Sequence, residues 1–185
     1  MRSERGPASQ LYVSPLTSHL LPLTFHPMSG AFQALSGVAN ANQILPNVIS
    51  GGQPTADQLK AFKAAGGDIV LDLRDPMEPR PVDEPAVVRE LGMEYVNIPV
   101  KAGALNDVTL ERILAVLRSA GERTVFFHCG SGGRVGAALI PHFILDHGMG
   151  EQDAIDQAMR VGLRNAEYLD WGLDYARRNQ PGPSP

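Results

Sequence analysis

The residue types best suited to chemistry stand together in one glycine-rich loop at 128–134, His-Cys-Gly-Ser-Gly-Gly-Arg. The loop follows an apolar segment at 124–127, typical of a buried strand, and precedes a helical pattern. Its glycines allow successive backbone N–H groups to turn inward, and the following helix adds its positive N-terminal end. An arginine fork suits two oxyanion oxygens. The loop therefore predicts an anion-binding cradle made by Gly130, Ser131, Gly132, Gly133 and Arg134.

Cys129 stands at the start of this cradle and is the single cysteine of the chain. A positive local field favours the thiolate, which is the nucleophilic form of cysteine. A nucleophile beside an oxyanion site is what covalent catalysis requires. The alternative interpretation is a glycine-rich turn that holds a buried, inert cysteine. A single cysteine also excludes an internal disulfide and a cysteine-rich zinc site.

The surrounding pattern alternates between strands and helices. Strands are expected at 48–49, 69–73, 95–98 and 124–127, and helices at 54–65, around 87–88, and at 110–117, 134–147, 151–161 and 165–178. This alternation predicts an α/β fold with a central, mostly parallel sheet of four or five strands, covered by helices on both faces. Ligands bind beyond the carboxyl ends of such strands, and the cysteine loop lies at that place.

The chain ends differ from the centre. Residues 1–40 are expected to be a flexible extension, because Pro15, Pro22 and Pro27 interrupt its apolar segment. The same interruption argues against a secretory signal and leaves a cytoplasmic location as the expectation, with Met28 as an alternative start. Residues 41–179 are the expected folded domain, and 180–185 are an expected disordered tail.

Composition limits the partners of this domain. Hydrophobic residues make up 43% of the 185 residues and charged residues 19%, which is an ordinary globular mixture. The net charge of −4 leaves no basic excess for nucleic-acid binding. No apolar segment approaches the roughly 18–20 residues that cross a bilayer. Neither a nucleic-acid partner nor a membrane partner is expected, and the oligomeric state is left open.

The cysteine loop resembles the signature of the cysteine-dependent protein tyrosine and dual-specificity phosphatase superfamily, which reads His-Cys, five residues, Arg. Together with segments 49–54, 70–74 and 95–100, it resembles more closely the bacterial beta-lactamase-hydrolase-like phosphatase domain, over about residues 45–178. The resemblance implies a protein tyrosine phosphatase-like fold and a phosphomonoester hydrolase that needs no cofactor or metal. Cys129 would attack the phosphorus of a phosphorylated protein or small molecule, and the cradle with Arg134 would hold its oxygens.

The resemblance also implies an aspartate that protonates the leaving oxygen and then activates water. Asp107 is the first candidate, because it follows the segment that supplies this acid in related enzymes, and Asp75 is the second. Each has a structural alternative, since Asn106 or Asp107 suits a helix N-cap and Asp75 suits a turn. His128 is expected to support the loop through hydrogen bonds rather than to act as a base.

Two departures from the superfamily pattern leave other functions open. Four residues separate Cys129 from Arg134, one fewer than usual, and this shorter loop resembles single-domain rhodaneses, whose cysteine carries a persulfide. Val135 stands where typical phosphatases have a hydroxyl that helps the cysteine leave, so slow hydrolysis of the phosphoenzyme is expected. The alternatives are a rhodanese-like sulfurtransferase and a catalytically weak module that binds a phosphorylated ligand.

The remaining polar and aromatic residues are expected to be structural. His142 and His147 lie five positions apart on an expected helix, which does not place them on one face, so they are not predicted to bind a metal. Core packing is the expected role of three aromatic residues at helical spacing, Tyr168, Trp171 and Tyr175. Solvated surface charge is the expected role of three cations, Arg74, Lys101 and Arg164.

Overall fold

The computed structural model describes residues 29–180 and contains a five-stranded sheet in the order β1-β2-β5-β3-β4. The strands are β1 (Asn42–Leu45), β2 (Val48–Gly51), β3 (Gly67–Asp72), β4 (Glu94–Asn97) and β5 (Thr124–His128). The last four are parallel to one another, whereas β1 pairs with β2 in the antiparallel direction. The predicted α/β fold with a mostly parallel central sheet is therefore confirmed.

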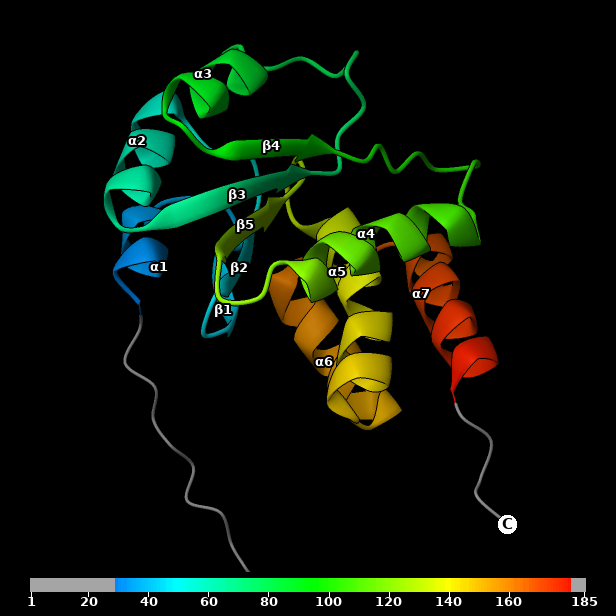
Figure 1. The fold of residues 1–185 in the computed structure, drawn as a ribbon. Helices are drawn as coiled ribbons and strands as arrows, with labels where there is room; N and C mark the ends of the chain where they lie inside the picture. The colour runs from blue at the N-terminus through cyan, green and yellow to red at the C-terminus, as the bar shows by residue number, and fades with distance from the viewer. Residues whose placement is uncertain (1–28, 181–185) are drawn as a thin grey trace, which may run out of the picture.

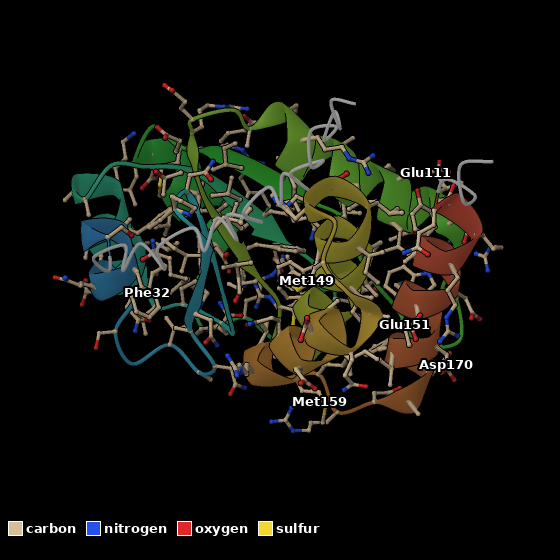
Figure 2. The ribbon with its side chains drawn as sticks, turned by 90° about the horizontal axis from the view of Figure 1, so that it is seen from below. Phe32, Glu111, Met149, Glu151, Met159 and Asp170 are labelled. Carbon is tan, nitrogen blue, oxygen red and sulfur yellow. The ribbon has the colours of Figure 1, made fainter. Side chains whose placement is uncertain are left out.

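Helices cover both faces of this sheet (Figure 1). One face carries α1 (Gly30–Ala34), α2 (Ala56–Ala64) and α3 (Glu84–Glu90), and the other carries α4 (Asp107–Ser119), α5 (Gly133–Pro141), α6 (Glu151–Val161) and α7 (Ala166–Asn179). A π-helical turn at His142–Asp146 continues α5. Seen from below, Phe32 of α1 and Asp170 of α7 lie on opposite sides of the molecule (Figure 2). No helix within residues 29–180 has both the length and the apolarity needed to cross a membrane.

The central strands are buried on both faces because successive side chains point in opposite directions. Ile69 and Leu71 of β3 pack with the helices α4 to α7, whereas Val70 packs with α1 to α3. In β5, Phe127 packs in the core formed with α4 to α7, and Phe126 packs in the core formed with α1 to α3. All five side chains are fully buried, as the short apolar segments of a parallel sheet require.

Residues 29–40 form a helix and a turn that pack on the core, which corrects the expectation that residues 1–40 are a flexible extension. Ser29 caps α1 by accepting the N–H of Phe32 at 3.1 Å. Ala31 of α1, the C-cap residue Leu35 and Val38 in the turn that follows are buried in the smaller core. The sequence signal for α1 was the helical spacing of four residues between Ala31 and Leu35. The apolar segment 20–25, Met28 and the expected tail at 181–185 lie outside the described residues.

Candidate active site

The cysteine loop begins at the carboxyl end of β5, the central strand of the sheet. Cys129 is 2% exposed, and its N–H donates to the carbonyl of Gly51 on β2 at 3.3 Å. The neighbouring strand β3 is connected in the same way, since the N–H of Leu73 donates to the carbonyl of His128 at 2.9 Å. Both flanking strands therefore fix the first residues of the loop.

The loop turns its carbonyl groups outward. Gly130 accepts the N–H of Gln53 at 3.1 Å, and Ser131 accepts the side-chain amide of Asn40 at 2.8 Å. Because the carbonyl and the following N–H of one peptide unit point in opposite directions, this arrangement turns the next N–H groups inward. The N–H of Gly132 donates to Cys129 Sγ at 3.1 Å. At least one backbone donor of the expected cradle therefore points at the sulfur.

Gly132 is the position of the loop where no other residue fits. Its φ of +93° lies in the left-handed region, and a Cβ there would lie 1.9 Å from the carbonyl oxygen of Val161. Gly136 permits a similar close approach, since its Cβ would meet the carbonyl oxygen of Ala158 at 2.6 Å. The start of α5 thus packs directly against the backbone at the end of α6, which fixes the N-terminus that faces Cys129.

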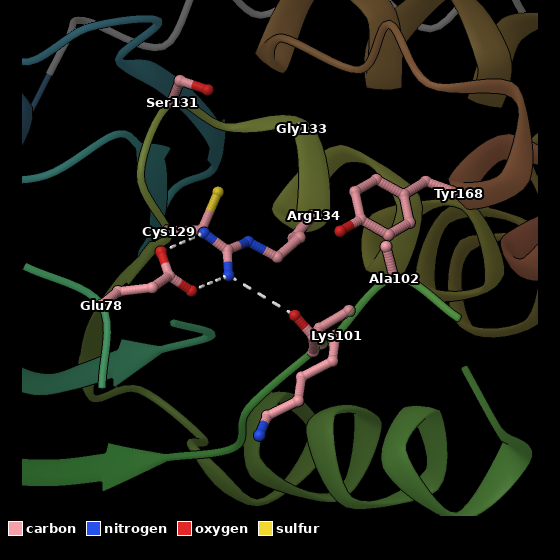
Figure 3. Close-up of a pocket in the computed structure, with 9 residues that line it drawn as sticks. Glu78, Lys101, Ala102, Cys129, Ser131, Gly133, Arg134 and Tyr168 are labelled. Carbon is pink, nitrogen blue, oxygen red and sulfur yellow. Dashed lines mark hydrogen bonds and ion pairs between the residues drawn. The ribbon is translucent and has the colours of Figure 1, made fainter. Parts of the chain in front are cut away.

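Arg134 is held by a carboxylate that sequence analysis did not identify. Glu78 accepts hydrogen bonds from Nη1 and Nη2 of Arg134 at 2.5 and 2.9 Å (Figure 3). The hydrogen bonds from Arg134 hold the pKa of Glu78 below its ordinary value, and the same bonds raise the pKa of Arg134. Glu78 lies in a proline-rich loop 56 residues before Arg134, so no local spacing could have predicted this pair.

A pocket of about 430 Å³ opens over these groups. It is lined by Glu78, Val100, Lys101, Ala102, Cys129, Ser131, Gly133, Arg134 and Tyr168. Two residues have a second role here. Tyr168 is half-buried and packs against the core, as expected, but it also lines the pocket. Lys101 is exposed, as expected of a surface charge, and it also lines the pocket and pairs with Asp75 (Figure 3). Trp171 and Tyr175 are buried, as expected of core residues.

A buried charge network lies behind the loop. Arg74 is 1% exposed, which corrects its expected place on the surface, and it pairs with Asp72 at 2.9 Å and Glu84 at 2.6 Å. Nε2 of His128 lies 2.6 Å from Glu84 Oε1, and Nδ1 of His128 lies 3.3 Å from the carbonyl of Cys129. His128 therefore connects the network to the loop and is placed to support the loop, as the sequence suggested.

Three residues of the network have the chemistry of metal ligands, but Arg74 already supplies the positive charge that a metal ion would bring. Asp72, Glu84 and His128 can bring one ligand atom each within 4.8 Å of the others, and all three are buried. The guanidinium of Arg74 contacts both carboxylates and supplies the positive charge that an ion would bring. Burial raises the pKa of Asp72, but the charges and hydrogen bonds of His128 and Arg74 outweigh it and lower that pKa. The cluster is therefore a compensated ion network.

Neither of the two aspartates considered as general acids lines the pocket. Asp107 is in the first turn of α4 and pairs with Arg178 at 2.8 Å, and the helix cap is Asn106. Arg178 lies ten residues beyond Tyr168 on α7, about 15 Å along the helix from the residue that lines the pocket. The structure thus separates Asp107 from Cys129, contrary to expectation. Asp75 lies at the pocket edge, where hydrogen bonding to Lys101 lowers its pKa.

Arg164 does not approach the pocket. Its guanidinium donates to the backbone carbonyls of Met159 and Leu163 at 2.6 and 2.5 Å. It closes the connection between α6 and α7 and is an exposed residue, in agreement with the surface position expected for it.

No protein-family model matches the chain, and no curated protein matches it. Solved structures match it at low identity. A DUF442 protein of Shewanella putrefaciens CN-32 is 22% identical, with a TM-score of 0.68, and the alignment covers 80% of this chain and 95% of that one. Tk-PTP is 20% identical over 75% of this chain and 97% of its own, with a TM-score of 0.66. TpbA of P. aeruginosa is 18% identical over 77% and 86%, with a TM-score of 0.61, and a variant of it has been solved with phosphotyrosine. The chain therefore has the fold of the protein tyrosine phosphatase-like proteins, as its cysteine loop implied.

Proposed function

We propose that the protein is a cysteine-dependent phosphomonoester hydrolase. The observation that carries this proposal is the position of Cys129 Sγ, 3.1 Å from the N–H of Gly132 and at the N-terminus of α5, in one pocket with Arg134. A sulfur nucleophile and the donors for an oxyanion share this point. The phosphotyrosine bound by TpbA, a protein of the same fold, supports an ester phosphate as the substrate group.

The reaction proceeds through two displacements. The thiolate of Cys129 attacks phosphorus, a sulfur–phosphorus bond forms, and the ester oxygen leaves with its electron pair and takes a proton from solvent water. Water then attacks the phosphocysteine, the sulfur–phosphorus bond breaks, and phosphate leaves while the thiolate is restored. The backbone N–H groups at 130–134 and the side chain of Arg134 hold the equatorial oxygens in both steps.

The pocket favours substrates with good leaving groups. Glu78 is the one carboxyl group that lines the pocket among the described residues, and hydrogen bonding to Arg134 lowers its pKa. A carboxyl group with a lowered pKa is a poor proton donor near neutral pH. Aryl phosphates, which need little protonation of the leaving oxygen, should therefore react faster than alkyl phosphates.

The second displacement should be the slow one. Val135 is fully buried in the core, so its position supplies no hydroxyl to the sulfur. Mixing the protein rapidly with an excess of p-nitrophenyl phosphate should release a burst of nitrophenolate that equals the concentration of sites, followed by a slower steady rate. Such a burst reports accumulation of a covalent intermediate.

Cys129→Ser tests the nucleophile. Serine is not ionised near neutral pH, so the burst and the steady rate should both vanish while inorganic phosphate still binds. Phosphate binding is measured by its protection of the protein against thermal unfolding. Hydrolysis at the original rate by the serine variant would contradict the covalent mechanism. Phosphate binding without turnover by the unaltered protein would favour a module that binds phosphorylated ligands.

Sulfur transfer is the second candidate, and the loop length favours it. Four residues between Cys129 and Arg134 enclose a smaller ring than five would. In this reaction the thiolate attacks the outer sulfur of thiosulfate, sulfite leaves, and cyanide takes the sulfur from the persulfide as thiocyanate. A parallel assay with thiosulfate and cyanide decides between the two enzymes. Thiocyanate formation without phosphate-ester hydrolysis would replace the phosphatase proposal.

A further inference from the structure

A π-helical turn brings together two histidines that an α-helix would separate. His142 and His147 are five residues apart, and the turn at His142–Asp146 follows the i to i+5 pattern of a π-helix. Their Nε2 atoms lie 3.3 Å apart, and the ring centroids lie 4.7 Å apart. The sequence-based rejection of this pair assumed α-helical geometry, and the structure overturns that assumption.

The pair lies at the end of the sheet opposite to Cys129. It faces a pocket of about 540 Å³ that also contacts Asn47 and Val48, where β2 begins, and Gly121, in the turn before β5. The cysteine loop, by contrast, follows the last residue of β5. His142 is 5% exposed, whereas His147 is exposed at the pocket mouth. The two histidines therefore form a site that is separate from the phosphatase pocket and open to solvent.

Asp146 prepares His142 as a ligand. Its Oδ2 lies 2.7 Å from Nδ1 of His142, so this ring nitrogen carries the proton and Nε2 presents its lone pair toward His147. Arg118 donates to both oxygens of Asp146 at 2.9 and 3.0 Å, which holds the carboxylate in place and balances the charge of the arginine.

We propose that His142 and His147 bind a divalent transition-metal ion, of the class of Zn²⁺, through their Nε2 atoms. A tetrahedral zinc ion with bonds of about 2.0–2.1 Å holds two nitrogen ligands about 3.3 Å apart, which matches the separation of the two Nε2 atoms. A carboxylate that accepts the other N–H of a ligating histidine is the usual second partner of such sites. Water from the open pocket completes the coordination. Two imidazoles select against Mg²⁺ and Ca²⁺, which prefer oxygen.

The test is a zinc titration of the full chain. The Cys129→Ser variant serves as the background because it removes a sulfur that could compete for zinc, and a chromophoric chelator reports the free metal. One zinc ion should bind, and His147→Gln should weaken binding by at least about tenfold. Asp146→Asn, which leaves both ligands in place, should weaken it by about tenfold. Asp170→Asn, an exposed aspartate of α7, is the matched control and should bind as the background does.

A second measurement keeps the result independent of folding. Zinc should raise the thermal midpoint of the background protein and leave that of the His147→Gln variant unchanged, while Mg²⁺ should shift neither. His147 is exposed, so this variant is expected to fold. Equal zinc affinity with and without His147 would place the metal elsewhere and overturn the proposal. Absence of any binding would mean that the two histidines share only a hydrogen bond, which also overturns it.

Discussion

The ion pair between Arg134 and Glu78 lies where a phosphate would bind, so a phosphate that enters the pocket must compete with Glu78 for Arg134. Glu78 uses both oxygens on the terminal nitrogens of Arg134, whose side chain is 15% exposed. A phosphate dianion in the cradle competes with this carboxylate for the guanidinium and is repelled by its charge. We therefore expect Glu78 to weaken phosphate binding while it holds Arg134 in the pocket.

Glu78→Gln should therefore tighten inhibition by inorganic phosphate by about 5- to 30-fold, since one charge-assisted pair is worth roughly 1–2 kcal/mol in a partly buried site. The amide retains a hydrogen bond acceptor for Arg134 but carries no charge. Steady-state inhibition of p-nitrophenyl phosphate hydrolysis measures the effect. Glu151→Gln is the matched control, because Glu151 forms a similar fork with Arg177 outside the pocket. Weaker inhibition would instead show that Glu78 chiefly orients Arg134.

Asp107→Asn should leave hydrolysis unchanged for substrates with good and with poor leaving groups, because Asp107 does not line the pocket. The ion pair with Arg178 is about half exposed and contributes about 0–1 kcal/mol, and Asn106 still caps the helix. Rates with p-nitrophenyl phosphate and an alkyl phosphate provide the measurement. A loss of about 10²- to 10⁴-fold on the alkyl substrate alone would restore Asp107 as the general acid.

Sequence analysis identified the residues of the site that act locally. Cys129, Arg134 and the glycines are neighbours in the chain, so their types and spacing suffice to predict a cradle. Glu78 and the buried position of Arg74 were missed because both depend on contacts across the fold. The carboxylates that compensate Arg74 come from the end of β3 and from α3. A charged residue without visible partners in the sequence is assigned to the surface by default.

At the scale of elements, the ion network connects β3, α3, β4 and β5. Asp72, at the end of β3, accepts hydrogen bonds from Arg74, Arg80 and the hydroxyl of Tyr95, and its side chain is fully buried. Removing one partner of a buried network leaves the others without compensation. The carboxylate of Asp72 thus stabilises the end of the sheet from which the cysteine loop departs.

Asp72→Asn should lower the free energy of unfolding by about 3–5 kcal/mol, because Arg74 and Arg80 lose the charge that compensates them. Urea unfolding followed by circular dichroism gives this quantity. The matched variant is Asp57→Asn, since Asp57 forms an exposed ion pair with Lys60 and should change stability by no more than about 1 kcal/mol. An equally small effect at Asp72 would show that the arginines find other partners or water.

The sequence predicted most helices and strands because each of them has the spacing of apolar residues that is typical of its type. The helices over α4, α6 and α7 and the four parallel strands lie where the pattern places them. The segment after α5 was predicted as a continuous helix to residue 147, but Pro141 and the following turn change it to a π-helix. This change depends on backbone hydrogen bonding rather than on side-chain pattern, so periodicity could not reveal it.

For the whole molecule, we expect stability to fall in two steps as the pH is lowered. The folded pKa of His142 is lowered by burial, so its protonation disfavours the folded state from about pH 6.5 downward. The pKa values of Asp72, Glu78 and Asp146 are also lowered, so their stabilising charge is lost below about pH 4. Urea midpoints between pH 8 and pH 3 test this, and His142→Gln should abolish the shallow step. A midpoint that is constant down to pH 3 would contradict it.

The central position of β5 has a consequence for how the molecule opens. This strand lies between β2 and β3, whereas β1 and β4 form the edges of the sheet. Amide protons on a doubly paired, fully buried strand exchange with solvent only when the whole domain unfolds, while edge strands exchange through local opening. The cysteine loop begins at the end of this strand. Transient separation of β1 or β4 should therefore leave the conformation of Cys129 and its loop unchanged. The loop should become disordered only when the whole sheet unfolds.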